Sequence, residues 1–153
     1  MNPTNRILFV DDSPQDTILA IEALSACNLA GEVIALRDGS LALDYLYRRG
    51  DFAERKSSQP AVILLDLKMP KVDGLEALKI IKRDPDLKTI PVVMLTSSEE
   101  ESDVLQSYQL GANAYVVKPM KFPDFVQAVR ELGTFWAIRN ESPTCSGPSL
   151  GRG

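Results

Sequence analysis

The 153-residue chain contains no histidine and only two cysteines, and both scarcities limit its chemistry. Without histidine, no imidazole can act as a general base, bind a metal or carry a phosphoryl group. Cys27 lies in an expected helix and Cys145 lies near the C-terminus, so the sequence does not predict a disulfide framework. We therefore expect a cytoplasmic protein whose chemistry depends on carboxylates, hydroxyls and amines.

The chain also lacks long apolar runs and an excess of positive charge. Its apolar runs are too short for a membrane-spanning helix, and the N-terminal MNPTNR has no apolar core of a signal peptide. The formal net charge of −4 disfavours binding to the phosphate backbone of nucleic acids. We therefore expect neither a membrane nor a nucleic-acid partner.

Five short apolar segments alternate with five segments of helical character. The expected strands are Arg6–Val10, Glu32–Leu36, Ala61–Leu65, Pro91–Leu95 and Ala114–Val117. The expected helices begin at Ser13-Pro14, at Asp38-Gly39 (ending at Arg49), at Gly74 (ending at Arg83), at Ser98 (ending at Leu110-Gly111) and at Phe122. Helical crossovers between successive strands make the strands parallel, so the fold class is α/β with a doubly wound sheet.

Four of the expected strands end in a polar group that can take part in chemistry. These groups are Asp11-Asp12, Asp66, Thr96 and Lys118. If the strand order is 2-1-3-4-5, it reverses between the first and third strands, and open α/β sheets bind ligands at that point. All four groups would then meet at the carboxyl edge of the sheet.

Three carboxylates at one edge require a cation, because like charges a few ångströms apart raise one another's pKa. Oxygen ligands without His or Cys favour Mg²⁺ over zinc. A carboxylate, a metal, a hydroxyl and an amine are the groups that phosphoryl transfer needs. Each group alone has a plainer explanation, since Asp11-Asp12 could cap a helix, Thr96 could simply end a strand and Lys118 could be solvated.

Four motifs, in this order, resemble the CheY-like receiver domains of two-component signalling. They are VDDSP at Val10–Pro14, LLDLKMPKVDG at Leu64–Gly74, MLTS at Met94–Ser97 and YVVKP at Tyr115–Pro119. The resemblance spans about Arg6–Leu132 and implies a flavodoxin-like three-layer α/β/α sandwich with a five-stranded parallel sheet of order 2-1-3-4-5. It also implies a response regulator, which is a phosphoacceptor for a sensor histidine kinase and not a classical enzyme.

The resemblance assigns roles to the acids and their neighbours. Asp66 would be the phosphoacceptor. Asp12, Asp66 and the backbone carbonyl of Lys68 would bind Mg²⁺, and Asp11 would act mainly through a bound water. Lys68 would also modulate the lifetime of the phosphoryl group.

The resemblance also assigns roles at the fourth and fifth strands. Thr96 would donate to the phosphoryl group and reorient on phosphorylation, and Lys118 would pair with a phosphoryl oxygen. Tyr115 would be the aromatic switch that follows Thr96 inward. Pro119 would follow a cis peptide that aims Lys118 into the site, and Ser98 would modulate the phosphoryl lifetime. Phosphorylation would remodel the face made by the fourth helix, fifth strand and fifth helix.

Further segments resemble the response regulators of bacterial phytochrome histidine kinases. They include RRGDFAE at Arg48–Glu54, SYQLGANAYVVKP at Ser107–Pro119 and the pair Phe135-Trp136. This resemblance implies a phytochrome as the kinase partner. Phe135 and Trp136 extend past the usual end of a receiver and predict an exposed partner or homodimer surface. No output domain is expected, so the output would be direct contact with a downstream protein or relay of the phosphate to another component.

We expect a receiver domain over residues 1–138 and a flexible Ser/Pro/Gly-rich tail over residues 139–153. The basic side chains beside the polar 50–60 loop are expected to be solvated; they are Arg48, Arg49, Arg55 and Lys56. Asp73-Gly74 is a turn signal, and Gly74 is expected to allow a close approach to the third helix.

Other classes of function are compatible with parts of this pattern. A phosphatase could use an aspartyl nucleophile, but it would need a second acid two residues later, where this chain has Lys68. A receiver could instead act by dimerisation alone, independently of phosphorylation. A nucleotide-binding domain is excluded, because no glycine fingerprint follows the first strand.

Overall fold

The computed structural model describes residues 6–25 and 33–139, and within them five strands form one parallel sheet. The strands are β1 (Ile7–Val10), β2 (Val33–Leu36), β3 (Val62–Leu65), β4 (Val92–Thr96) and β5 (Ala114–Val117). Their order is β2-β1-β3-β4-β5, and every pairing is parallel. The predicted fold class and strand order are therefore confirmed, and the order reverses between β1 and β3.

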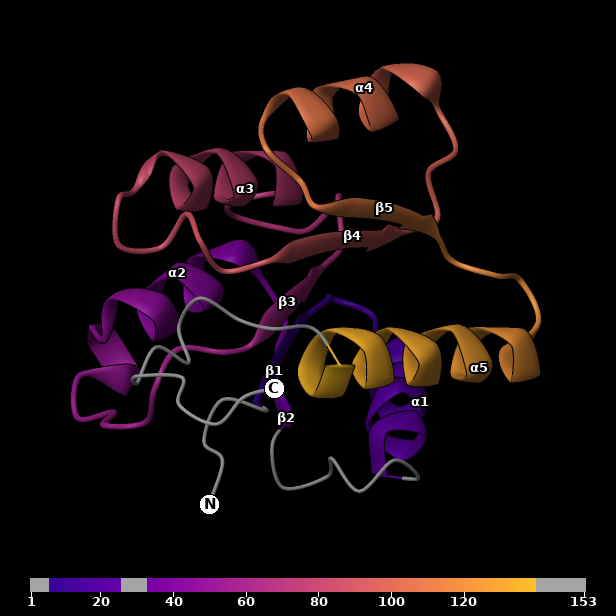
Figure 1. Cartoon of the computed structure of the whole chain (residues 1–153), viewed down its shortest axis with the longest axis horizontal. Coiled ribbons are helices and arrows are strands. Elements are labelled where there is room, and N and C mark those ends of the chain that lie inside the picture. The colour runs from indigo at the N-terminus through magenta and orange to yellow at the C-terminus, as the bar shows by residue number, and fades with distance from the viewer. Residues whose placement is uncertain (1–5, 26–32, 140–153) are drawn as a thin grey trace.

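Five α-helices connect and cover the strands. They are α1 (Pro14–Ser25), α2 (Gly39–Tyr47), α3 (Gly74–Arg83), α4 (Glu101–Gln109) and α5 (Phe122–Gly133). A 3₁₀ turn, η3 (Gly50–Phe52), follows α2, and a π-helical turn, η4 (Thr134–Arg139), continues α5. Figure 1 shows α1 and α5 together on one side of the sheet and α2 and α3 on the other. No helix in the described ranges is long and apolar enough to cross a membrane.

The sheet is buried on both faces, which explains why its strands are continuous apolar runs. In β1, Leu8 and Val10 pack into the core shared with α2 and α3, while Ile7 and Phe9 pack into the core shared with α1 and α5. Because successive side chains point to opposite faces, every residue of this strand is covered. The polar residue that follows β1 is therefore held at the rim of a rigid layer.

The starts of α1 and α2 follow the predicted capping chemistry. Pro14 is the first residue of α1, and Asp38 caps α2 by accepting from the N–H of Leu41 at 2.8 Å. The end of α2 was predicted at Arg49 but falls at Tyr47, because Arg48 adopts a left-handed φ of 56°. The start of α4 was predicted at Ser98 but falls three residues later, at Glu101.

The end of α5 differs in part from the prediction. Phe135 and Trp136 lie in η4 with their rings at 5.0 Å in an edge-to-face contact. Phe135 is 50% exposed, as a partner surface would need, whereas Trp136, the last residue of the apolar stripe from Phe122, is half-buried against the core of α1 and α5. Arg139, predicted as the start of the tail, still belongs to η4. The expectations for Cys27 and for residues 140–153 fall outside the described residues.

The basic residues beside the 50–60 loop are not all solvated, contrary to the prediction. The guanidinium of Arg55 lies 3.9 Å from the centroid of the Tyr45 ring and donates to the backbone carbonyl of Tyr45 at 3.0 Å. Arg48 also donates to a loop carbonyl, whereas Arg49 pairs with Asp44 at the surface. Arg55 therefore organises the loop, because its planar group bonds several carbonyls at once.

Candidate functional site

Asp11, Asp12 and Asp66 meet at the point where the strand order reverses. β1 and β3 pair with Val10 opposite Leu65, so the acids that follow these strands begin side by side. The N–H of Asp66 donates to the carbonyl of Val10 at 2.9 Å, which fixes the loop after β3 to β1. One carboxylate oxygen from each of the three acids lies within 4.8 Å of the others. Asp11 and Asp66 are buried, and Asp12 is exposed.

Lys118 comes from the end of β5 and closes the site. The backbone N–H of Lys118 donates to the backbone carbonyl of Thr96 at 2.7 Å, and the Lys118 side chain is only 8% exposed. The ammonium lies 2.6 Å from Asp11 Oδ2 and 3.6 Å from Asp66 Oδ2. The sequence therefore placed Lys118 correctly beside the acids.

The predicted cis peptide before Pro119 is wrong, because the described residues contain no cis peptide bond. Trans is the lower-energy form even before proline. Lys118 points into the site with this trans peptide, as its bond to Asp11 shows.

The electrostatics of the cluster reflect its burial. Burial raises the pKa of Asp11 to about 6, although a hydrogen bond from Lys118 opposes the shift. Burial also raises the pKa of Asp66, against the attraction of Lys118. For Lys118 itself burial lowers the pKa, but bonds to Asp11 and Asp16 outweigh it and raise the pKa to about 12. One ammonium thus compensates the acids only in part.

The donor set fits a hard divalent cation. All three groups are carboxylates, two are buried, and an exposed third ligand leaves room for water. Burial, the main cause of the raised pKa of Asp11, makes the negative charge of this carboxylate unfavourable. A bound cation would offset that unfavourable charge. The acidic triad is therefore a metal-binding site of the kind that the sequence predicted.

Thr96 and Tyr115 are linked through Ser98. Thr96 is buried, and its side chain gives a hydrogen bond to Asp66. The Tyr115 hydroxyl donates to the carbonyl of Ser98 at 3.0 Å, and the N–H of Ser98 points to Thr96 Oγ1 at 3.4 Å. Ser98 Oγ also bonds Asp103 Oδ2 at 2.6 Å, which ties this loop to α4. The structure thus connects both predicted switch residues to the backbone of one residue, Ser98, Thr96 through its N–H and Tyr115 through its carbonyl.

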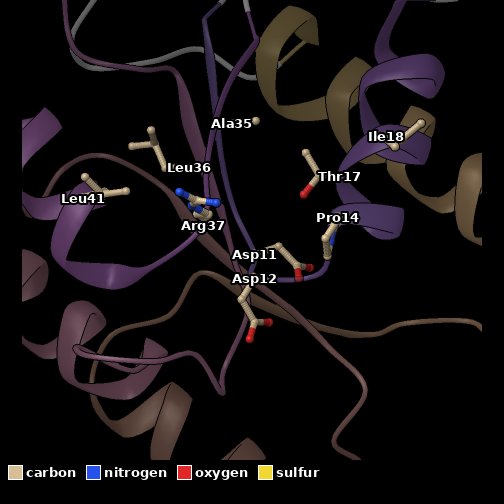
Figure 2. A pocket seen from close by; sticks show the side chains of 9 residues that line it. All are labelled: Asp11, Asp12, Pro14, Thr17, Ile18, Ala35, Leu36, Arg37 and Leu41. Atoms are coloured by element: carbon tan, nitrogen blue, oxygen red, sulfur yellow. The ribbon is translucent and has the colours of Figure 1, made fainter.

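Two cavities border the acids. One, of about 690 Å³, is lined by Asp66, Lys68, Thr96, Ser97, Ser98, Glu99 and Glu100. The other, of about 410 Å³, lies between α1 and the segment from β2 to α2. Figure 2 shows Asp11 and Asp12 at its end, with Thr17 and Ile18 on one side and Leu41 on the other.

The sequence reasoning missed Asp16. This residue lies in the first turn of α1, and its carboxylate bonds Lys118 at 2.8 Å. No strand end marked it, and an acid in a first helical turn is common because it favours the helix dipole. Its spacing of one helical turn after Asp12 is the only signal that could have pointed to it.

Comparison with known proteins agrees with this geometry. Residues 7–130 match the model of the response regulator receiver domain. The response regulator Rcp1 of Synechocystis sp. is 44% identical over 135 residues, which cover 88% of this chain and 90% of Rcp1. Its Mn²⁺-bound crystal structure matches with a TM-score of 0.82 and 42% identity, over 90% of this chain and 97% of that one.

Two other solved structures are close relatives. The phosphorylated cyanobacterial phytochrome response regulator RcpA has a TM-score of 0.85 and 40% identity, over 90% of this chain and 97% of its own. The bacteriophytochrome response regulator RtBRR is 57% identical with a TM-score of 0.71, over 90% of this chain and 83% of its own. From the family match, these relatives and the acidic pocket together, the chain belongs to the response regulator receiver domains, which are phosphoacceptor modules of two-component signalling and not classical enzymes.

Proposed function

We propose that Asp66 is the phosphoacceptor and that a sensor histidine kinase supplies the phosphoryl group. The observation that carries the proposal is the surroundings of Asp66: a buried carboxylate in a triad of acids, with an ammonium 3.6 Å from its Oδ2. The larger cavity gives a donor access to this carboxylate from the side of Thr96. Phosphoryl transfer needs little more than such positioning and charge compensation.

In the proposed reaction, a carboxylate oxygen of Asp66 attacks phosphorus while the bond from phosphorus to the donor imidazole breaks. The imidazole leaves with the electrons of that bond and takes a proton. Lys118 pairs with a phosphoryl oxygen, and Thr96 turns its hydroxyl from Asp66 to another. The acyl phosphate on Asp66 is the signalling form.

Mg²⁺ is the proposed cofactor. Asp12, Asp66 and the backbone carbonyl of Lys68 would hold it, and Asp11 would act mainly through a bound water. The bound ion would offset charge on the phosphoryl oxygens during transfer. The existence of a Mn²⁺-bound form of Rcp1 supports a divalent cation as the cofactor of this protein too.

The proposed output runs through Ser98. When Thr96 turns to the phosphoryl group, the Ser98 N–H loses that acceptor, while the Ser98 carbonyl still holds Tyr115. A shift of Ser98 would move Tyr115, through the Ser98 carbonyl, and the start of α4, through the bond to Asp103, together. This is a shift between two populated states and leaves the fold unchanged.

The proposed kinase partner is a phytochrome. The names of RcpA and RtBRR, which link them to phytochromes, support this choice. The exposed ring of Phe135 beside Trp136 supports a homodimer or partner surface at the end of α5. We place the protein in the cytoplasm with its kinase.

The test is labelling of the full chain by acetyl phosphate, followed by intact-protein mass spectrometry. We expect one phosphoryl group in the presence of Mg²⁺, none with excess EDTA and none in Asp66→Asn. Asp86→Asn, a surface acid, is the control and should be labelled normally. Undiminished labelling of Asp66→Asn would refute the assignment. Oligomeric state and kinase binding that do not change with beryllofluoride would favour the phosphorylation-independent module.

A further inference from the structure

The Lys118 ammonium has an acidic partner outside the metal-binding triad. Its Nζ lies 2.6 Å from Asp11, 2.8 Å from Asp16 and 3.6 Å from Asp66. An ammonium has three N–H groups, and two of them are donated to Asp11 and Asp16. Lys118 is therefore bound more closely to Asp11, after β1, and to Asp16, in the first turn of α1, than to Asp66.

Asp16 is held independently of the triad. The described group of acids that could share a cation consists of Asp11, Asp12 and Asp66, without Asp16. The backbone N–H of Asp16 donates to Ser13 Oγ at 3.2 Å, so its position is fixed by the first turn of α1. Its side chain is 26% exposed and lines a cavity of about 400 Å³ together with Lys118.

A phosphoryl group on Asp66 requires the same ammonium that Asp16 holds. To pair with a phosphoryl oxygen, Lys118 must move towards Asp66, which lies 0.8 Å farther from Nζ than Asp16 does (3.6 − 2.8 Å). Because the Lys118 side chain is 8% exposed, water replaces the lost carboxylate contact poorly. The attraction of Asp16 therefore opposes this movement.

We propose that Asp16 is a positioning residue that competes with the phosphoryl group of Asp66 for the Lys118 ammonium, and that it thereby sets how readily Asp66 is phosphorylated. The inference rests on the proposed role of Asp66 as acceptor. Loss of the Asp16 charge leaves Lys118 anchored by Asp11 and removes the attraction that opposes its movement towards the phosphoryl group.

The first experiment compares Asp16→Asn with the wild-type chain. We expect acetyl phosphate to label Asp16→Asn about two- to fivefold faster, and beryllofluoride to bind it more tightly by a similar factor, as befits a partly exposed ion pair. Glu22→Gln, an exposed acid on the same helix, removes the same charge without touching Lys118 and should change neither quantity. Asp16→Ser is a second variant with the same expected gain, and Asp16→Glu should restore slower labelling.

The second experiment repeats Asp16→Asn in a Lys118→Ala background. If Asp16 acts through Lys118, the gain disappears in this background. A gain that persists would mean that the lost charge acts directly on the donor, and it would overturn the inference. The Mg²⁺ affinity of Asp16→Asn, measured by calorimetry, should stay within about twofold of wild type; a larger loss would place Asp16 in the metal site instead.

A spectroscopic measurement separates positioning from a purely structural role. In ¹⁹F NMR of bound beryllofluoride, the fluorine that accepts from Lys118 should shift in Asp16→Asn while the other fluorine signals stay in place. Uniform or absent shifts would overturn the inference. Unlabelled wild-type protein would refute the proposed function itself, whereas normal wild-type labelling with no gain in Asp16→Asn or Asp16→Ser would refute only the role of Asp16.

Discussion

Gly74 lies directly against the backbone carbonyl oxygen of Asp66, so that a β-carbon at position 74 would overlap that oxygen. The N–H of Gly74 also donates to the carbonyl of Leu67 at 2.7 Å. The start of α3 therefore holds the loop that carries Asp66, the proposed acceptor. The sequence predicted a close approach at Gly74, and the structure confirms it and identifies Asp66 as the neighbour.

We expect Gly74→Ala to lower the free energy of unfolding by about 1–3 kcal/mol, because the added methyl group has to displace backbone and not a flexible side chain. The displaced loop should also slow the labelling of Asp66 by acetyl phosphate. Urea denaturation and labelling kinetics measure the two effects. Glu76→Ala, an exposed change in the same helical turn, should alter stability by less than about 0.5 kcal/mol. An unchanged free energy of unfolding in Gly74→Ala would show that the loop carrying Asp66 can move to accommodate the methyl group without loss of stability.

Arg55→Lys should destabilise the protein by on the order of 2 kcal/mol, because a lysine cannot reproduce the planar set of bonds. The guanidinium donates to Ser57, Ser58 and Gln59 as well as to Tyr45. Thermal or urea denaturation measures the loss. Its neighbour Lys56 is exposed, so Lys56→Ala is the matched control and should have little effect. Equal stabilities of the two variants would mean that the loop is not held by Arg55.

Tyr47→Phe should raise the pKa of Asp84 towards its ordinary value of about 3.9. The Tyr47 hydroxyl donates to Asp84 Oδ2 at 2.6 Å, and this bond lowers the pKa of Asp84 and raises that of Tyr47. NMR titration of the Asp84 carboxyl measures the change. Tyr108→Phe, at another exposed tyrosine, should leave the Asp84 titration unchanged.

The same bond predicts a pH window for stability. A carboxyl with a lowered folded pKa contributes stability above its unfolded pKa and loses it as the pH falls through the folded value. A tyrosine with a raised folded pKa contributes below about pH 10 and loses its contribution as the pH rises through the folded value. The stability gap between wild type and Tyr47→Phe should therefore be constant between about pH 5 and pH 9 and close at both ends. A gap that widened below pH 4 would contradict this assignment.

Asp103→Ala should loosen the loop between β4 and α4, because it removes the 2.6 Å bond to Ser98 Oγ. We expect faster amide hydrogen exchange over residues 98–100, measured by mass spectrometry, with little change in the sheet. Asp124→Ala removes an exposed acid from the first turn of α5, and is the matched control for the loss of a helix-dipole interaction. Similar exchange in both variants would show that the Ser98 bond does not hold the loop.

The sheet and the acidic triad were predictable because they follow from local patterns. Five apolar runs joined by helical crossovers allow few parallel arrangements, and the side chains after those runs must gather at one edge. Asp66 and Lys118 could thus be paired without a structure, although 52 residues separate them in the sequence (118 − 66). The site residues could be located because each apolar strand changes abruptly to a polar residue where it ends.

Other features depend on packing that no local pattern encodes. The bond from Asp16 to Lys118 requires the first turn of α1 to face the end of β5, and many first-turn acids face only water. Arg55 was predicted to be solvated because its neighbours in sequence are polar, whereas its partners were unknown until the loop was folded. Trp136 ends an apolar stripe that begins at Phe122 but lies past the usual end of a receiver, so the sequence left its exposure open; the turn of η4 packs it against the core.

Because Asp11 and Lys118 lie far apart in the sequence, the site is completed late in the synthesis of the chain. Their bond joins positions 107 residues apart, and β5 is the last of the described strands to leave the ribosome. A nascent chain that already displays Asp66 still lacks the Lys118 ammonium, which we propose pairs with the phosphoryl group. On that proposal, a truncated or stalled chain without Lys118 would not compete with finished molecules for phosphoryl groups.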